Sequence, residues 1–446
     1  MKRIILTFIG VASLLLPIQA QSRLTISECI SMAKGNNKLL QAARHQQMAY
    51  NYDKNAMLAN FFPKISLEGI GAYDDVSFRY STESASLPVV DASGALAGTS
   101  VPFPGLDLDA RIGWIFSGGV LLQQPLYMGG KIITGYRMAK LGNEISRENV
   151  RLTESDIIVK TSQAFANVVK AYELQDVAQN YNALLEELYR SVVKAFEQGV
   201  KTKNDVLKVQ VKLNESKLKL RQTENAVRLA TMNLCHYIGL PLTEKPLVSQ
   251  ELPPTMQVEN TPDIVNRPEY RMLEKKTELA RQQIKLEWSE RLPQVALLAN
   301  FGYTNGLKLN NKKLIDGSSW LAGVKVSIPV FHFGHGHNKV MAARARYSQT
   351  QSEQADSNEM LQLQLTQSMN NLDEAELELQ LANSSVDSAK ESLRVSRRQY
   401  EAGLETLSDY LETQTLWRQA IQTQIEARVN RYMCFLEYQK ASGCIN

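Results

Sequence analysis

The chain has 446 residues, of which 44% are hydrophobic, 22% are charged, 24 are Gly and 14 are Pro. These proportions exclude a collagen-like chain and a wholly disordered one, because enough apolar side chains are present to build a packed core. Four Cys are too few for a disulfide scaffold, and a formal net charge of +4 does not indicate a nucleic-acid-binding protein.

The N-terminus has the pattern of a secretory signal peptide over residues 1–20. Two basic residues precede a mainly apolar stretch from Ile4 to Leu16, and Ala20 provides a small residue at the expected cleavage point. A transmembrane anchor is not favoured, because a helix of this length reaches only about 20 Å of the roughly 30 Å of hydrocarbon. No later stretch predicts a transmembrane helix, but the short alternating strands of a barrel remain compatible with the sequence.

An internal repeat organises the rest of the chain. The segment from Gln124 to Gly130 resembles the segment from Ile328 to Gly334, with an offset of 204 residues. The same offset relates Gly199, with its aromatic and acidic neighbours, to Gly403. Two matches in one frame indicate a duplication.

We predict a first repeat over residues 21–245, a linker over 246–262, a second repeat over 263–443 and a tail over 444–446. Each repeat is predicted to contain a helix, two strands, a long helix, a turn and a returning helix. Residues 82–106, rich in Ser, Ala, Gly and Pro, are extra in the first repeat and are predicted to form a long loop.

The first helices are predicted at 25–60 and 262–291, and the strands at 64–74, 112–124, 294–304 and 319–328. The long helices are predicted at 130–198 and 338–402, with returning helices that end near His236 and Gln439. A helix of 65 to 70 residues extends about 100 Å. Its many polar residues exclude a membrane span and favour a coiled coil.

Four strands per chain do not close a membrane barrel, because lipid does not tolerate open sheet edges. The sequence therefore predicts an oligomer, in which two copies would supply eight strands and three copies twelve. Helices of about 100 Å exceed the thickness of a bilayer and must project into water.

At this point the sequence resembles the TolC family of outer-membrane efflux proteins. The resemblance covers roughly residues 24 to 443 and rests on motifs in a duplicated frame: the junctions at Pro125 and Pro329, the Arg267-Pro-Glu269 opening, the turns at Gly199 and Gly403, and the closing segment from Ala427 to Tyr432. It implies a mainly α-helical chain with a small transmembrane β-barrel, closed by a homotrimer in the outer membrane of a Gram-negative bacterium. It also implies a helical tunnel in the periplasm.

The resemblance further implies partners: a periplasmic adaptor that docks at Gly199 and Gly403, an inner-membrane pump and outer-membrane lipid. The function expected is a passive exit duct for tripartite efflux or type I secretion, gated at its periplasmic end. No enzyme motif, nucleotide site or cofactor site stands out. The alternative is a soluble periplasmic coiled-coil adaptor, against which the duplicated strand pairs count.

The resemblance places a gate at the second turn. Asp409 and Glu412 lie six and nine residues after Gly403, where the family carries acidic residues around the periplasmic entrance. Three copies would gather six carboxylates at one constriction and attract cations. The alternative is that both are solvated acids on a surface helix.

The family holds its closed entrance with a network of Tyr, Arg and Asp, and the matching residues here are Tyr400, Arg428 and Asp205. A second Arg of that network is replaced by Glu405. Pairs between Lys and Glu of the two turns, such as Lys201 with Glu405 and Lys208 with Glu412, are a possible substitute. The alternative is independent solvated charges.

Two further groups of side chains leave alternatives open. His332, His335 and His337 have a spacing that clusters imidazoles, but no acidic residue or Cys accompanies them, so polar filling of a junction is preferred over a metal site. A disulfide between Cys29 and Cys444 would be compatible with an oxidising periplasm, although free thiols are preferred.

Overall fold

The computed structural model describes residues 23–253 and 263–445. The predicted signal peptide and residues 254–262 of the predicted linker lie outside the described residues. The described chain divides into a helical unit, made of residues up to Met48, Glu144–Lys276 and from Ser352 onward, and a second unit, made of Ala49–Asn143 and Thr277–Gln351, which contains the β-sheet. Each unit thus draws on both predicted repeats, whose boundaries remain predictions.

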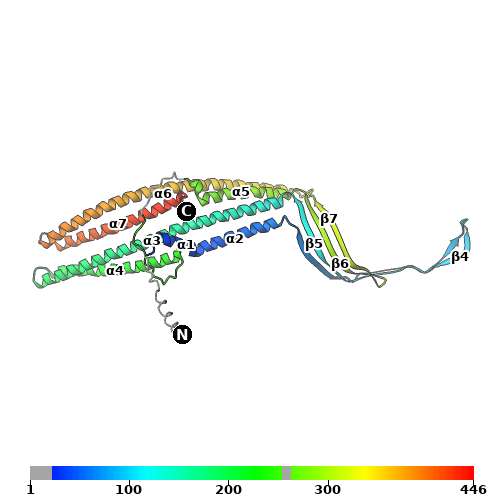
Figure 1. The fold of residues 1–446 in the computed structure, drawn as a ribbon, viewed down its shortest axis with the longest axis horizontal. Coiled ribbons are helices and arrows are strands. Elements are labelled where there is room, and N and C mark those ends of the chain that lie inside the picture. The colour runs from blue at the N-terminus through cyan, green and yellow to red at the C-terminus, as the bar shows by residue number, and fades with distance from the viewer. Residues whose placement is uncertain (1–22, 254–262, 446) are drawn as a thin grey trace, which may run out of the picture. The chain divides into compact units, whose positions relative to one another are not determined.

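The order of elements follows the predicted plan (Figure 1). The first repeat contains α1 (Ile26–Asn36), α2 (Lys38–Ala59), β1 (Lys64–Tyr73), β2 (Ser77–Ser81), β3 (Ala85–Val90), β4 (Leu96–Phe103), β5 (Asp107–Met128), α3 (Lys131–Glu197) and α4 (Lys203–Ile238). The second contains a 3-10 turn (Ile264–Asn266), α5 (Pro268–Ser289), β6 (Gln294–Leu309), β7 (Lys312–Ser327), α6 (His335–Glu401) and α7 (Leu407–Ala441).

The two long helices have bounds that share the offset of the sequence repeat. Helices α3 and α6 are each 67 residues long, and both their first and their last residues differ by the offset of 204. Helices α4 and α7 begin at the same offset. None of the helices in the described ranges carries an apolar stretch long enough to cross a bilayer.

The first helix, predicted as one element over residues 25–60, is two helices separated at Asn37. The backbone of Asn37 is extended, and its side-chain Oδ1 accepts a hydrogen bond of 2.9 Å from the Leu39 amide, which caps α2. Its Nδ2 donates to the Tyr237 carbonyl at 3.1 Å. The chain therefore bends at Asn37, whose side chain caps α2 and also donates a hydrogen bond to the end of α4.

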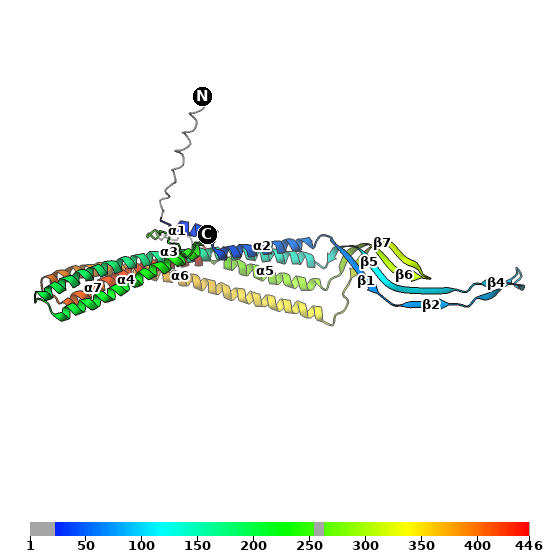
Figure 2. The same ribbon diagram turned by 90° about the horizontal axis from the view of Figure 1, so that it is seen from below.

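The sheet has the strand order β1-β5-β6-β7, and every pairing is antiparallel. Strand β2 continues alongside the outer part of β5, as Figure 2 shows. The predicted loop at 82–106 is wrong in part, because it contains the β3–β4 hairpin. In this hairpin Leu87 pairs with Val101, and a turn at Asp91 joins the two strands.

The two faces of the sheet differ in polarity. Leu67, Val120, Phe301 and Trp320 form one cross-strand row, so their side chains share a face. All four are exposed, Leu67 by 85% and Trp320 by 78%. The opposite face carries polar side chains, including Glu68, Ser117, Thr304 and Ser319, around a cavity of about 500 Å³. The strands therefore place apolar residues on one face of the sheet and polar residues on the other.

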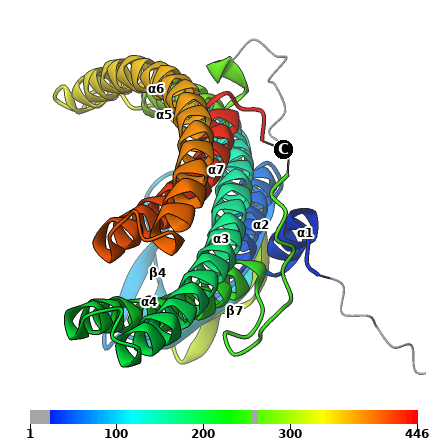
Figure 3. The same ribbon diagram turned by 90° about the vertical axis from the view of Figure 1, so that its left-hand side faces the viewer.

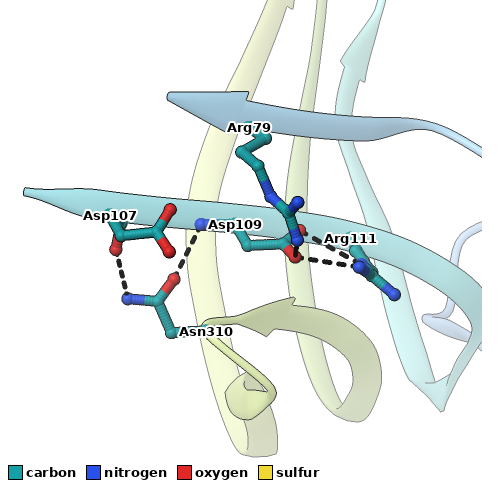
Figure 4. Close-up of polar contacts among 5 residues, drawn as sticks. All are labelled: Arg79, Asp107, Asp109, Arg111 and Asn310. Atoms are coloured by element: carbon teal, nitrogen blue, oxygen red, sulfur yellow. Dashed lines mark hydrogen bonds and ion pairs between the residues drawn. The ribbon is translucent and has the colours of Figure 1, made fainter. Parts of the chain in front are cut away.

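One side chain joins the β6–β7 turn to β5 (Figure 4). Asn310 and Asn311 both have positive φ, as a two-residue hairpin turn requires. Asn310 Oδ1 accepts from the Asp109 amide at 2.7 Å, and its Nδ2 donates to the Asp107 carbonyl at 2.8 Å. The Asp109 carboxylate in turn accepts from Arg79 on β2 and from Arg111 on β5. These contacts hold the turn and two strands together.

The helical unit packs as two hairpins, α3–α4 and α6–α7, which lie side by side in Figure 3. One buried cluster joins α1, α3 and the end of α4, and includes Phe165, Val168 and Leu234. A second buried cluster lies near the turns and joins α3, α4 and α7. We call it the turn cluster, and its buried members are Tyr181, Leu185, Leu188, Val192, Val209, Leu213, Leu407, Tyr410 and Leu411. This cluster positions the candidate site.

Candidate channel entrance at the helical turns

Both hairpins of the helical unit reverse direction at a glycine. Gly199 and Gly403 have φ values of 78° and 76°, in the left-handed region, and no other atom lies within 4 Å of the position of an added Cβ. The amides of Val200 and Leu404 donate to carbonyls of the preceding helix, in both cases at 2.8 Å. The predicted tight turns are therefore present, and a side chain there would be strained by backbone conformation alone.

Matched caps start the two returning helices. Thr202 and Asp205 form a capping box at the start of α4, with the Asp205 carboxylate accepting from the Thr202 amide at 3.0 Å and hydroxyl at 2.8 Å. Thr406 caps α7 through its side chain, whose hydroxyl accepts from the Asp409 amide at 3.3 Å and donates to the Asp409 carboxylate at 2.7 Å. The hydrogen bond from the Thr202 backbone, followed by that from its side chain, lowers the pKa of Asp205.

The two predicted gate acids are on the surface of α7. Asp409 and Glu412 are both exposed and lie three residues apart in the first turns of the helix. The Asp409 carboxylate accepts from the capping residue Thr406, whereas Glu412 has no hydrogen bond or ion pair among the described residues. A single chain therefore presents both carboxylates to water, and their role in a gate remains a prediction.

Three residues of the predicted latch lie together at the turns, namely Tyr400, Lys201 and Asp205. The Tyr400 ring stacks on that of Tyr410, with centroids 4.9 Å apart and planes 11° from parallel. The Lys201 ammonium lies 4.7 Å from the centre of the Tyr400 ring, within the range of a cation–π contact. Burial, followed by the charge of Asp205, raises the pKa of the Tyr400 hydroxyl. Tyr410, which packs α7 against α6 here, was not predicted.

The other latch residues have different partners in the chain. Glu405 accepts a hydrogen bond of 2.8 Å from Ser396, and Lys208 donates to Ser408 at 3.0 Å. The hypothetical pairs of Lys201 with Glu405 and of Lys208 with Glu412 are thus absent from the ion pairs of the described residues. Arg428 forms an ion pair with Glu173 on α3, about 30 Å of helix from the start of α7.

Arg428 is therefore not brought to Tyr400 and Asp205 within one chain. A side chain whose partner lies on another helix is difficult to place from sequence, since the partner depends on how the helices pack. Ser396, the partner of Glu405, and Ser408, the partner of Lys208, were not predicted, because an uncharged side chain gives no charge pattern from which to infer a pair.

The histidine and cysteine candidates do not form ligand sets. Within the described ranges, no three His, Cys, Asp or Glu side chains are grouped as metal ligands, and His332, His335 and His337 are exposed. All four Cys are free, which contradicts a disulfide between Cys29 and Cys444. Burial, followed by the charge of Glu28, raises the pKa of the Cys29 thiol to about 11 and makes it unreactive.

The model of one protein family, described as outer membrane efflux protein, matches residues 29–240 and 264–437. The chain belongs to the outer membrane efflux protein family. The resemblance found from the sequence is thereby confirmed. Each matched segment falls within one of the two predicted repeats.

Solved structures with this fold are similar along nearly the whole chain. The CmeC outer membrane channel of Campylobacter jejuni is 17% identical with a TM-score of 0.78, and the alignment covers 94% of this chain and 86% of that one. The outer membrane protein VceC of Vibrio cholerae is 14% identical with a TM-score of 0.75, covering 94% and 96%. These likenesses establish the fold, with its long helices and its sheet.

A relative that matches in sequence over part of the chain is the alkaline protease secretion protein AprF of Pseudomonas aeruginosa. It is 22% identical over 223 residues, which are 48% of this chain and 46% of AprF. The matched part thus spans about half the length of that relative.

Proposed function

We propose that this outer membrane efflux protein is a passive exit duct in the outer membrane of a Gram-negative bacterium. Three copies would close a twelve-stranded barrel and a helical tunnel that projects into the periplasm. Export would serve a tripartite efflux pump or, as the name of AprF suggests, a type I secretion system. We assign no catalytic role to the chain, and the energy for transport would come from an inner-membrane pump.

The incomplete sheet is the observation that supports this proposal. In the described residues, β1 pairs only with β5 and β7 only with β6, so both edges of the four-strand path are open. One face of the same sheet exposes large apolar side chains, such as Leu67 and Trp320. Open edges are not stable in lipid, whereas pairing β7 of one copy with β1 of the next removes them.

The turns support an entrance at the other end of the helices. Three copies would bring the exposed Asp409 and Glu412 of each chain around one axis, where like charges favour bound cations. Gly199 and Gly403 leave open space around both turns, as a docking surface for a periplasmic adaptor requires. Transient opening there would connect an adaptor and pump to the barrel.

Fractionation and electrical recording test the proposal together. Detergent should extract the protein from outer membranes as a trimer that resists SDS, and the trimer should form cation-preferring channels in planar bilayers. Recovery as a soluble monomer of the periplasm would contradict the duct and would support the alternative of a soluble adaptor.

A further inference from the structure

A glutamine of α7 is buried without a hydrogen-bonding partner. Gln414 has no exposed surface, and neither its Oε1 nor its Nε2 has a partner in the described part of the chain. It follows Leu407 and Leu411 at helical spacing, so the three side chains share a face. On that face, Leu407 and Leu411 belong to the turn cluster, which also contains residues of α3 and α4.

Neighbouring polar side chains of α7 differ from Gln414 because they border a groove or have a hydrogen-bonding partner. Thr415 and Arg418 border a groove of about 790 Å³ between α3, α4 and α7, whereas Gln414 does not border it. The Thr415 hydroxyl also donates to the Leu411 carbonyl at 2.8 Å. Because Gln414 is covered completely by its own chain, a second copy cannot reach its amide unless α7 moves.

Burial without partners raises the free energy of the packed state. In water, a primary amide makes hydrogen bonds through both its oxygen and its nitrogen, and these are lost when α7 packs on α3 and α4. An apolar side chain of the same size would not incur this loss. Separation of α7 from the other two helices would hydrate the amide and recover those bonds.

We infer that Gln414 is a conformational device that weakens the closed packing of the helical turns and so favours opening. The inference rests on the proposed duct, since it identifies opening with movement of α7 away from α3 and α4. This destabilising effect of Gln414 requires no ligand and no charge, and it would add to any effect of the carboxylates of Asp409 and Glu412.

The test replaces the amide by an apolar group of similar shape. Gln414→Met should raise the midpoint of thermal unfolding of the purified protein and lower the open probability in planar bilayers on the order of tenfold. Gln414→Glu should act in the opposite direction, because a buried charge favours the hydrated arrangement more strongly. Gln419→Met is the matched control, since Gln419 lies on the same helix and is exposed.

The outcomes separate this inference from the proposed function. An unchanged midpoint and open probability in Gln414→Met, or a lower midpoint, would overturn it, because the amide would then be stabilised where it lies. A similar effect of Gln419→Met would also overturn it. If the wild-type protein forms no channels, the duct itself is refuted, while the unfolding midpoints still decide whether the buried amide is destabilising.

Discussion

Asp409 combines a structural contact with the capping residue Thr406 and the charge proposed for the entrance. Its repeat equivalent Asp205 caps α4 through the same Thr–Asp contact. The capping role needs only an oxygen that accepts from the Thr hydroxyl, whereas a cation filter needs the negative charge. Amide substitutions therefore separate the two roles better than alanine does.

We expect Asp409→Asn combined with Glu412→Gln to abolish cation preference and block by trivalent ions, measured in planar bilayers. The unfolding free energy should change by less than about 1 kcal/mol, because the Asn oxygen still accepts from Thr406. Asp409→Ala is the control for the cap and should lower the unfolding free energy by about 1 kcal/mol. Wild-type selectivity and block in the double amide variant would mean that these acids are ordinary surface charges.

At the scale of residues, the sequence predicted positions better than partners. Gly199, Gly403 and the equivalence of Asp205 with Asp409 follow from the repeat, since equal offsets place equal residues at equal points of two hairpins. The pairing of Arg428 with Glu173 does not follow, because it depends on the packing of α7 against α3. Gln414 was missed for a different reason: on a long helix rich in Gln, a buried Gln has the same local pattern as an exposed one.

At the scale of elements, the strands allow a direct test of which face meets lipid. Val324 pairs with Leu297 on the apolar face, and Ser327 has the opposite parity on the same strand. We expect Val324→Lys to destabilise the folded protein by about 2–4 kcal/mol, because a charge would be placed in hydrocarbon. Ser327→Lys should have little effect. The yield of SDS-resistant trimer measures both, and equal yields would show that the faces have been assigned wrongly.

The turn between α6 and α7 allows a second test, of backbone conformation against steric access. Gly403→Val should abolish export while leaving the trimer in the membrane, because a β-branched residue strains the left-handed conformation at φ 76°. Gly403→Asn keeps that conformation accessible but adds bulk. Export assays on both variants then distinguish strain, which affects Val alone, from blocked docking, which affects both. Normal export by Gly403→Val would show that this turn is not part of the docking surface.

The elements differ in how far sequence predicted them. Helix α3 was predicted to within one residue at each end and α6 to within three, because long segments without Pro are bounded by Gly at repeat-related positions. The break at Asn37 was missed, since it depends on an amide that also bonds to Tyr237 in a distant helix. The β3–β4 hairpin was missed because its Ser, Gly and Pro content is typical of loops. Its two short strands pair only with each other, so no neighbouring strand of the predicted plan indicated them.

At the scale of the whole molecule, the structure of one chain is incomplete in a specific way. The helical unit has buried clusters of its own, but the sheet leaves two edges open and an apolar face uncovered. The sequence indicated this deficit, because four predicted strands are fewer than a membrane barrel needs. Counting strands cannot select the number of copies, which is why the trimer follows from family resemblance and remains to be measured.

The equal lengths of α3 and α6 constrain how such a protein can evolve. Shortening the α3–α4 hairpin by one heptad, about 10 Å, takes a deletion in each of its two arms and leaves its turn out of level with that of the α6–α7 hairpin. In the proposed duct, a change in the depth of the entrance below the outer membrane therefore requires four matched deletions or insertions, one in each arm, with equivalent arms 204 residues apart. Paired length changes among homologues would then record differences in the spacing between the two membranes of the cell envelope.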